Sequence, residues 1–123
     1  MSLKCLLLLL LLAASLKAAD VTDLTFTLNG DGTEYSVTDC QESASGSLDI
    51  PEEYNGLPVT SIGDYAIYNC RWLTSVNIPG SVTSIETGAF QYSTRLTSVN
   101  IPDSVTSIGQ IAFYECTSLA SIT

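Results

Sequence analysis

The sequence predicts a repeat solenoid, mostly β, in which short strands stack as successive coils. A first observation is a phrase that occurs twice: LTSVNIPGSVTSI begins at Leu73, and LTSVNIPDSVTSI begins 23 residues later, at Leu96. A second is that VTSI occurs from Val59, Val82 and Val105, at the same interval. A fixed period in the twenties is typical of solenoid folds. We therefore expect a right-handed coil with short helical or 3₁₀ turns, preceded by an N-terminal β-hairpin cap.

Residues 1–19 predict a secretory signal peptide. A short segment with one lysine is followed by the unbroken apolar run 5–12 and then by small residues. That order is typical of an export signal, and the run is too short to span a bilayer. Cleavage after Ser15, Ala18 or Ala19 fits the pattern. We expect a secreted or cell-surface protein with no membrane span.

The chain beyond this leader is strongly acidic. Residues 20–123 hold all thirteen acidic residues and only two cations, Arg71 and Arg95, which gives a formal charge of −11 (2 − 13). Such a surface repels phosphate backbones and anionic lipid headgroups. Nucleic acid is therefore excluded as a partner, and the abundant, regularly spaced apolar residues exclude disorder.

Residues 20–44 predict the hairpin cap. LTFTL alternates apolar and polar residues from Leu24, and EYSVT follows after the glycine-rich turn NGDG. The turn superficially resembles a calcium loop, but Thr27 and Thr38 stand where that loop places its first Asp and its bidentate Glu. The hairpin interpretation is preferred. We expect no metal and no cofactor, since the chain also lacks histidine.

Residues 45–123 predict the repeats: a first coil with an insertion at 45–72, full units at 73–95 and 96–118, and a partial unit at 119–123. The insertion, EEYNGLP from Glu52, is interpreted as a capping loop, with a binding loop as the alternative. The partial unit predicts a truncated chain, or an uncapped end that pairs with another copy. One unit cannot close a core alone, so the following apolar columns require stacked coils. The columns are Val59, Val82 and Val105; Ile62, Ile85 and Ile108; Ala66, Ala89 and Ala112; Ile67, Phe90 and Phe113; Leu73, Leu96 and Leu119; Val76 and Val99; Ile78 and Ile101.

Within a coil, LTSVNIP is a short strand that Pro79 or Pro102 ends. The combined pattern LTSVNIPxSVTSIxxxAFxxC resembles the BspA-like leucine-rich repeat, the 23-residue treponemal class, over residues 47–123. Ile67 departs from its aromatic position and Ser93 from its cysteine position. The resemblance implies a leucine-rich-repeat solenoid that binds proteins or mediates adhesion at the cell surface.

Three cysteines follow the leader. Cys70 and Cys116 share a column two coils apart, which separates their α-carbons by about 10 Å at a strand spacing of about 4.8 Å. A disulfide needs less than about 7 Å, so we expect buried structural thiols. Cys40 can pair with Cys70 if the cap folds over the first coil, although a free Cys40 is the preferred interpretation.

No catalytic residues are predicted, and we expect no enzyme. Glu52 and Glu53 lie in a loop, the other carboxylates are scattered, and no histidine base is present. The alternatives are an accessory domain or fragment of a carbohydrate-active enzyme, and an inert end of a longer repeat array.

The polar face of the strand ladder is the candidate binding surface, for a protein or a glycan ligand. The alternative is that its small polar residues merely suit a crowded parallel sheet, because the face lacks the Tyr, Trp and Arg that dominate interface energetics. A rival aromatic surface on the turn side holds Tyr68, Trp72, Tyr92 and Tyr114. The two stripes of the candidate surface are Ser47, Ser75, Ser98 and Ser121, and Asp49, Asn77, Asn100 and Thr123.

Overall fold

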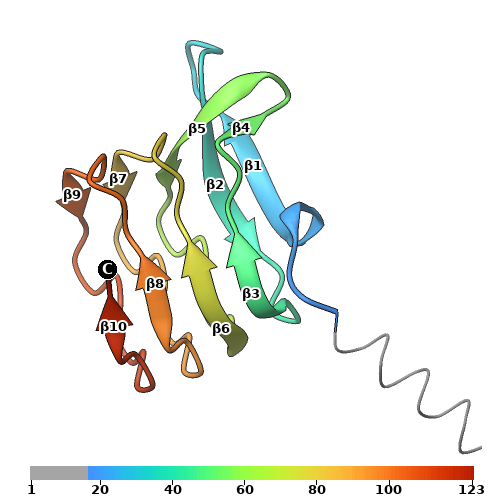
Figure 1. Ribbon diagram of the computed structural model, residues 1–123. Helices are drawn as coiled ribbons and strands as arrows, with labels where there is room; N and C mark the ends of the chain where they lie inside the picture. Colours follow the sequence, from blue (N-terminus) through green and yellow to red (C-terminus); the bar gives the residue numbers. More distant parts are fainter. Residues whose placement is uncertain (1–16) are drawn as a thin grey trace, which may run out of the picture.

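The computed structural model describes residues 17–123, so the apolar run of the expected signal peptide lies outside the described residues. The described chain is a β-solenoid whose strands form two ladders, one in front of the other (Figure 1). The predicted repeat solenoid with an N-terminal hairpin is therefore confirmed. Its elements are η1 Val21–Asp23, β1 Leu24–Leu28, β2 Tyr35–Cys40, β3 Ser45–Asp49, β4 Glu53–Tyr54, β5 Leu57–Ile62, β6 Trp72–Asn77, β7 Ser84–Ile85, β8 Ser98–Asn100, β9 Ser107–Ile108 and β10 Ser121–Ile122.

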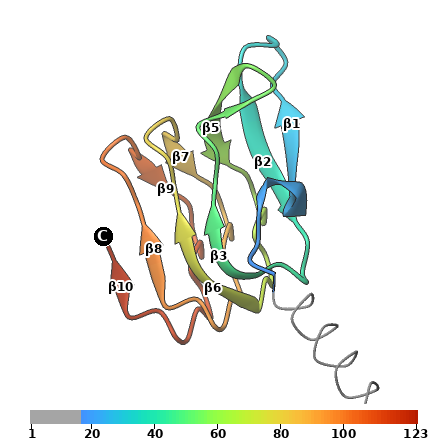
Figure 2. The ribbon, with the colours of Figure 1, turned by 45° about the vertical axis from the view of Figure 1, so that its right-hand side comes forward.

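Two sheets with parallel strand pairing hold the coils together. One sheet has the order β3-β6-β8-β10, and the other runs β1-β2-β5-β7-β9 with β4 beside β5. Residues 23 apart are paired, so Ile62 lies beside Ile85 and Ile85 beside Ile108. Turning the molecule by 45° shows the two sheets on opposite sides of each coil (Figure 2). The repeat period therefore sets the strand register directly.

The core lies between the two sheets and consists of the predicted columns. Ile62 and Ile85 are fully buried, and Phe90 stacks on Phe113 with ring centroids 5.1 Å apart. Ile108, the third member of its column, is 52 % exposed because no further strand of the described chain covers β9. Burying an aliphatic side chain stabilises a fold by about 1.5–3 kcal/mol. Each coil obtains that energy only from its neighbours.

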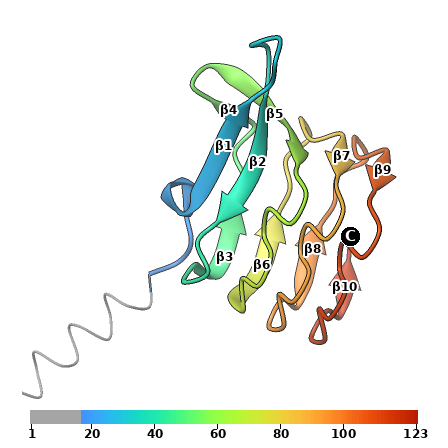
Figure 3. The same ribbon diagram turned by 180° about the vertical axis from the view of Figure 1, so that it is seen from behind.

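The two strands of the N-terminal hairpin extend one sheet of the solenoid. β1 and β2 pair antiparallel from Leu24 with Cys40 to Leu28 with Tyr35, and β2 pairs in parallel with β5 (Figure 3). In the connecting turn, the Asn29 side-chain oxygen accepts from two backbone N–H groups at 2.9 and 3.2 Å. Asn29 therefore closes the turn between the two strands.

The insertion before β5 packs against this hairpin. Asn55 and Gly56 have φ values of 50° and 80°, as the two-residue turn between β4 and β5 requires. Tyr54 stacks on Phe26 at 4.1 Å and meets Tyr35 edge-on at 5.0 Å between centroids. These contacts agree with the interpretation of the insertion as a capping loop.

The segments that lead from β5 to β6, from β7 to β8 and from β9 to β10 are series of short hydrogen-bonded turns. The Tyr68 N–H, for example, donates to the Tyr65 carbonyl at 3.2 Å. Left-handed residues at every fourth position keep these turns from continuing into a helix. One such column is Tyr65, Gly88 and Ile111, with φ values of 54°, 62° and 52°, and the other is Asn69, Tyr92 and Glu115, with 58°, 63° and 59°. Ile111 is strained there, because a β-branched residue rarely adopts positive φ.

At Gly109 the backbone lies directly against the backbone of the preceding coil. A Cβ atom on Gly109 would lie 2.5 Å from backbone atoms of Glu86 and Thr87. Gly80, by contrast, has no atom within 4 Å of such a Cβ, and the next coil carries Asp103 at the same position. The two glycines therefore tolerate side chains very differently.

The first described residues are part of the fold. Ala19 is buried, and its N–H donates to the Ser45 carbonyl at 2.7 Å. The Ser45 hydroxyl donates to the Lys17 carbonyl at 3.0 Å. The Lys17 ammonium lies 2.6 Å from the Asp20 carboxylate and, together with the Thr22 hydroxyl, holds the pKa of Asp20 at about 2. Residues 17–19 are therefore attached to β3.

Candidate functional site

The outer face of the β3-β6-β8-β10 sheet carries the two predicted polar stripes. Strand register places Ser75 beside Ser98 and Asn77 beside Asn100. Asn77 and Asn100 are exposed, and the Asn100 amide donates to the Asn77 side-chain oxygen at 3.0 Å. The same register brings Ser47 beside Ser75, Asp49 beside Asn77 and Ser121 beside Ser98. The structure therefore lines up the predicted residues of these four strands.

Two adjoining hollows lie along these stripes. The first has a volume of about 220 Å³ and the second about 210 Å³, and both are lined by Asn77 and Asn100. The polar residues of the first hollow belong to the predicted surface and include Thr123, whereas Ile50, Ile78 and Pro79 beside the second did not appear in the prediction. Strand alternation could not reveal these three, because they follow the ends of β3 and β6, and Ile50 and Ile78 are buried. The first hollow is lined by Ser47, Ser75, Val76, Asn77, Ser98, Asn100 and Thr123, and the second by Asp49, Ile50, Asn77, Ile78, Pro79 and Asn100.

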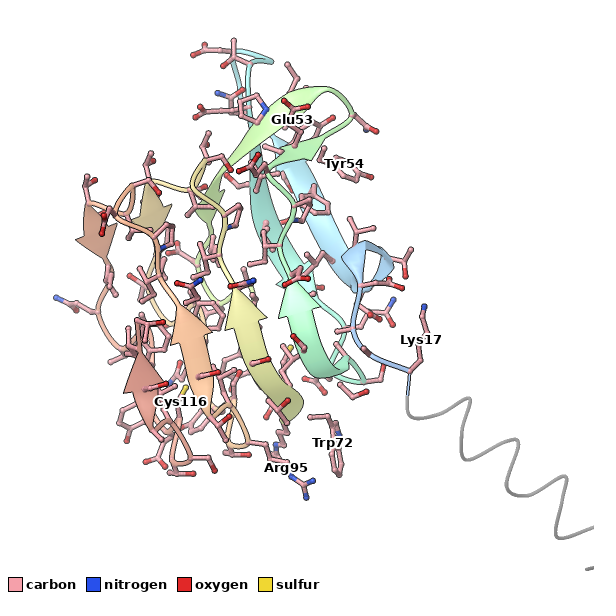
Figure 4. All side chains as sticks on the ribbon, in the orientation of Figure 1. Lys17, Glu53, Tyr54, Trp72, Arg95 and Cys116 are labelled. Atoms are coloured by element: carbon pink, nitrogen blue, oxygen red, sulfur yellow. The ribbon has the colours of Figure 1, made fainter. Side chains whose placement is uncertain are left out.

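The chemistry of this face is that of hydrogen bonding. Hydroxyl and amide groups both donate and accept, so the face suits peptide backbone or sugar hydroxyls equally. Glu52 and Glu53, the loop carboxylates, are both exposed, and Figure 4 places Glu53 with Tyr54 at the opposite end of the coil from Trp72. Within residues 17–123 no group of His, Cys, Asp and Glu side chains is arranged to hold a metal ion.

The predicted thiol column links each coil to the one before it. The Cys116 thiol donates to the Phe90 carbonyl at 3.0 Å, and Ser93, which replaces a cysteine in the middle coil, donates to the Ile67 carbonyl at the same distance. Cys70 is fully buried, as expected. Cys116, labelled in Figure 4, is only partly buried because it belongs to the last described coil, and that burial raises the pKa of its thiol. The column therefore supplies side-chain donors between coils.

Cys40 lies beside Cys70, and both are free thiols. Their sulfur atoms lie 3.7 and 3.8 Å from the same acceptor, the Gln41 carbonyl oxygen. The Cys40 thiol raises the pKa of Cys70 by hydrogen bonding, and burial raises it further. The cap thus reaches the first coil at this point without a covalent bond.

The rival aromatic surface divides into two parts. Tyr68, Tyr92 and Tyr114 contact one another in sequence, and Tyr65, which the sequence interpretation missed, extends the row. Trp72 is instead covered by Arg95, whose guanidinium carbon lies 4.3 Å from the ring centroid; Figure 4 shows the pair at the lower edge of the coil. The spacing of Tyr65 from Tyr68, three residues within one turn, is the signal that could have identified it.

A comparison with family profiles matches residues 40–123 to six copies of the BspA type leucine-rich repeat region. The chain belongs to the BspA-type leucine-rich repeat family. A search among curated proteins gives no match. Within the described residues of this BspA-type protein, no helix is both long enough and apolar enough to cross a membrane.

Solved structures of leucine-rich repeat proteins share the fold. The protein of T. pallidum is 30 % identical with a TM-score of 0.79, and the match covers 87 % of this chain and 50 % of that one. A leucine-rich cell surface protein of Faecalibacterium prausnitzii is 34 % identical with a TM-score of 0.69, over 82 % of this chain and 28 % of that one. A protein of Bacteroides ovatus is 32 % identical with a TM-score of 0.72, and the match covers 81 % of this chain and 27 % of that one. This BspA-type chain therefore spans half the length of the first and less than a third of the other two.

Proposed function

We propose that this BspA-type protein is an extracellular, non-enzymatic module that binds another protein through the outer face of the β3-β6-β8-β10 sheet. The observation that carries the proposal is the strand register, which repeats one polar row from coil to coil. Solenoids of stacked repeats commonly use such a continuous surface for binding. The export signal predicted at residues 1–19, and the similarity to a protein described as a cell surface protein, support the extracellular location.

A protein partner accounts for this face better than a small molecule does. The two hollows, of about 220 and 210 Å³, fall below the range of about 300–1,000 Å³ that is usual for ligand pockets. Their linings combine hydroxyl, amide and aliphatic groups from β3, β6 and β8, so a partner must extend across several coils to use them. The exposed Asp49 adds negative charge at one end, which favours a partner with basic residues there.

The test is a binding screen against purified extracellular matrix proteins by biolayer interferometry, using a matched pair of double variants. Asn77→Lys/Asn100→Lys places two long cations on the proposed face and should weaken binding about tenfold or more. Thr83→Lys/Thr106→Lys adds the same charge at two exposed positions that adjoin β7 and β9 of the other sheet, and should preserve binding.

Equal losses in the two double variants would show that added charge, and not the strand face, changes the affinity. If no matrix protein binds with a Kd below about 100 μM, that partner class is wrong. Binding of neutral oligosaccharides through Asn77 and Asn100, with no bound protein, would identify a glycan-binding face instead.

A further inference from the structure

The turn side of the solenoid carries a continuous ladder of four tyrosines that the strand-face proposal does not use. Tyr65 meets Tyr68 at 5.9 Å, Tyr68 meets Tyr92 at 5.7 Å and Tyr92 meets Tyr114 at 6.0 Å between ring centroids. Three of the rings are 46 %, 39 % and 50 % exposed at Tyr65, Tyr68 and Tyr114. These four residues form the tyrosine ladder. They lie on three successive coils, so the ladder extends along the solenoid axis.

A tyrosine beside the shared repeat position completes this ladder. Tyr68 and Tyr114 share a repeat position, but the middle coil has Gln91 there, and Gln91 is buried. Tyr92, the next residue, has a φ of 63° and places its ring between the other two. Asn69 and Glu115, at the same repeat position as Tyr92, have the same left-handed backbone, so the tyrosine side chain alone distinguishes the middle coil.

Gly88 of the next coil leaves room for the Tyr65 ring. A Cβ on Gly88 would lie 2.4 Å from the Tyr65 ring, so the ring rests where only glycine leaves space. A positive φ at Gly88 makes glycine the natural residue there for a second reason. The ladder is therefore a packed structure and not a chance grouping of surface tyrosines.

The ring geometry distinguishes between possible partners. Successive rings are inclined at 81°, 73° and 69° to each other. Such edge-to-face packing makes no continuous flat platform for a run of sugar rings. It leaves separate ring faces, and the negative face of an aromatic ring attracts a cation above it.

The charges beside the ladder also favour a cationic partner. Asp64 precedes Tyr65 and Glu115 follows Tyr114, and both carboxylates are exposed and in no ion pair within residues 17–123. The whole chain carries a formal charge of −9, which attracts cationic partners from a distance. The protein already contains one contact between a guanidinium and an aromatic ring, because Arg95 lies over Trp72.

We propose that the tyrosine ladder is a second docking surface, for an arginine-bearing basic segment of a partner protein. Guanidinium groups would lie over the exposed faces of Tyr68 and Tyr114, while Asp64 and Glu115 pair with neighbouring cations. Arginine suits this role better than lysine because its planar, weakly hydrated group stacks on aromatic faces. The surface shares no residue with the strand face, so either one is able to bind without the other.

The test uses the purified secreted protein and fluorescein-labelled nona-arginine, with nona-lysine as the comparison peptide, in fluorescence anisotropy at low salt. Tyr68→Ser/Tyr114→Ser removes two ring faces and should weaken nona-arginine binding about 5- to 30-fold. Tyr68→Phe/Tyr114→Phe keeps the faces and should bind within about twofold of the unmodified protein. Asn77→Ala/Asn100→Ala, on the strand face, should leave this affinity unchanged.

A measurement on the unmodified protein keeps the test independent of folding defects. On titration with nona-arginine, amide NMR shifts should move in the turn segments 64–71, 88–95 and 111–116 and not along β6 and β8. The proposal is overturned if nona-arginine does not bind, if nona-lysine binds as tightly, or if the Ser variant binds like the unmodified protein. Loss of binding in the Phe variant would also overturn it, because the hydroxyls and not the ring faces would then be responsible. A neutral oligosaccharide that moves the same shifts, where the basic peptide does not, would assign the ladder to glycans.

Discussion

Replacing Ser93 by alanine should destabilise the solenoid far more than the same replacement at Ser81. Ser93 is fully buried and its hydroxyl donates to the Ile67 carbonyl at 3.0 Å. No other donor to that carbonyl occurs within residues 17–123. Ser93→Ala therefore leaves a buried carbonyl without a partner, which costs about 1–3 kcal/mol.

Ser81 supplies the matched control. Its hydroxyl oxygen is also buried, but within the described residues it has no hydrogen-bond partner. Ser81→Ala deletes the same atom and breaks no bond, so the free energy of unfolding should stay within about 0.5 kcal/mol or rise. Ser93→Cys introduces the residue that the next coil has at this position, where the Cys116 thiol makes the equivalent hydrogen bond. It should lower the free energy of unfolding by less than about 1 kcal/mol.

Urea unfolding followed by the fluorescence of Trp72, the single tryptophan, measures all three free energies. A loss of 1 kcal/mol corresponds to about 4–8 °C in Tm for a domain of this size, so thermal unfolding by circular dichroism provides a second readout. The reasoning is refuted if Ser93→Ala and Ser81→Ala differ by less than about 0.5 kcal/mol. The hydroxyl at position 93 would then fill space without linking the coils.

Three further predictions concern close packing, backbone strain and processing. Gly109→Ala should lower the free energy of unfolding by about 1–3 kcal/mol because its Cβ meets the backbone of the preceding coil, whereas Gly80→Ala should be nearly neutral; urea unfolding compares them. Ile111→Gly should stabilise the fold by up to about 1 kcal/mol by relieving its left-handed backbone, and an unchanged or lower Tm would contradict this. N-terminal sequencing of the exported protein should find Leu16, because of the three candidate sites only cleavage after Ser15 keeps both Lys17, which accepts from Ser45, and the buried Ala19; a start at Ala19 or Asp20 would refute it.

The candidate strand face could be predicted in detail because strand alternation and the repeat period are enough to place its residues. In a strand, side chains alternate between faces, and the 23-residue period places equivalent residues beside one another. Asn77 beside Asn100, and Ser75 beside Ser98, follow from these two rules alone.

The tyrosine ladder could not be predicted completely for the opposite reason. Tyr92 does not share a repeat position with Tyr68 and Tyr114, yet its ring lies in contact with both of theirs. Column matching, which identified the core, therefore misses the one shift that makes the ladder continuous. The missing information is where the Tyr92 ring packs, which only the stacked coils show.

The sequence by itself determined the solenoid, its period, its apolar columns and the register of its ladders, because identical phrases at a fixed interval bury their apolar residues only by stacking. Tertiary structure alone decided which side chains meet between unlike segments. The approach of Cys40 to Cys70, the packing of Tyr54 on Phe26 and the attachment of Ala19 to β3 are such contacts. They join the cap to the first coil, where the repeat is interrupted and no period relates one residue to the next.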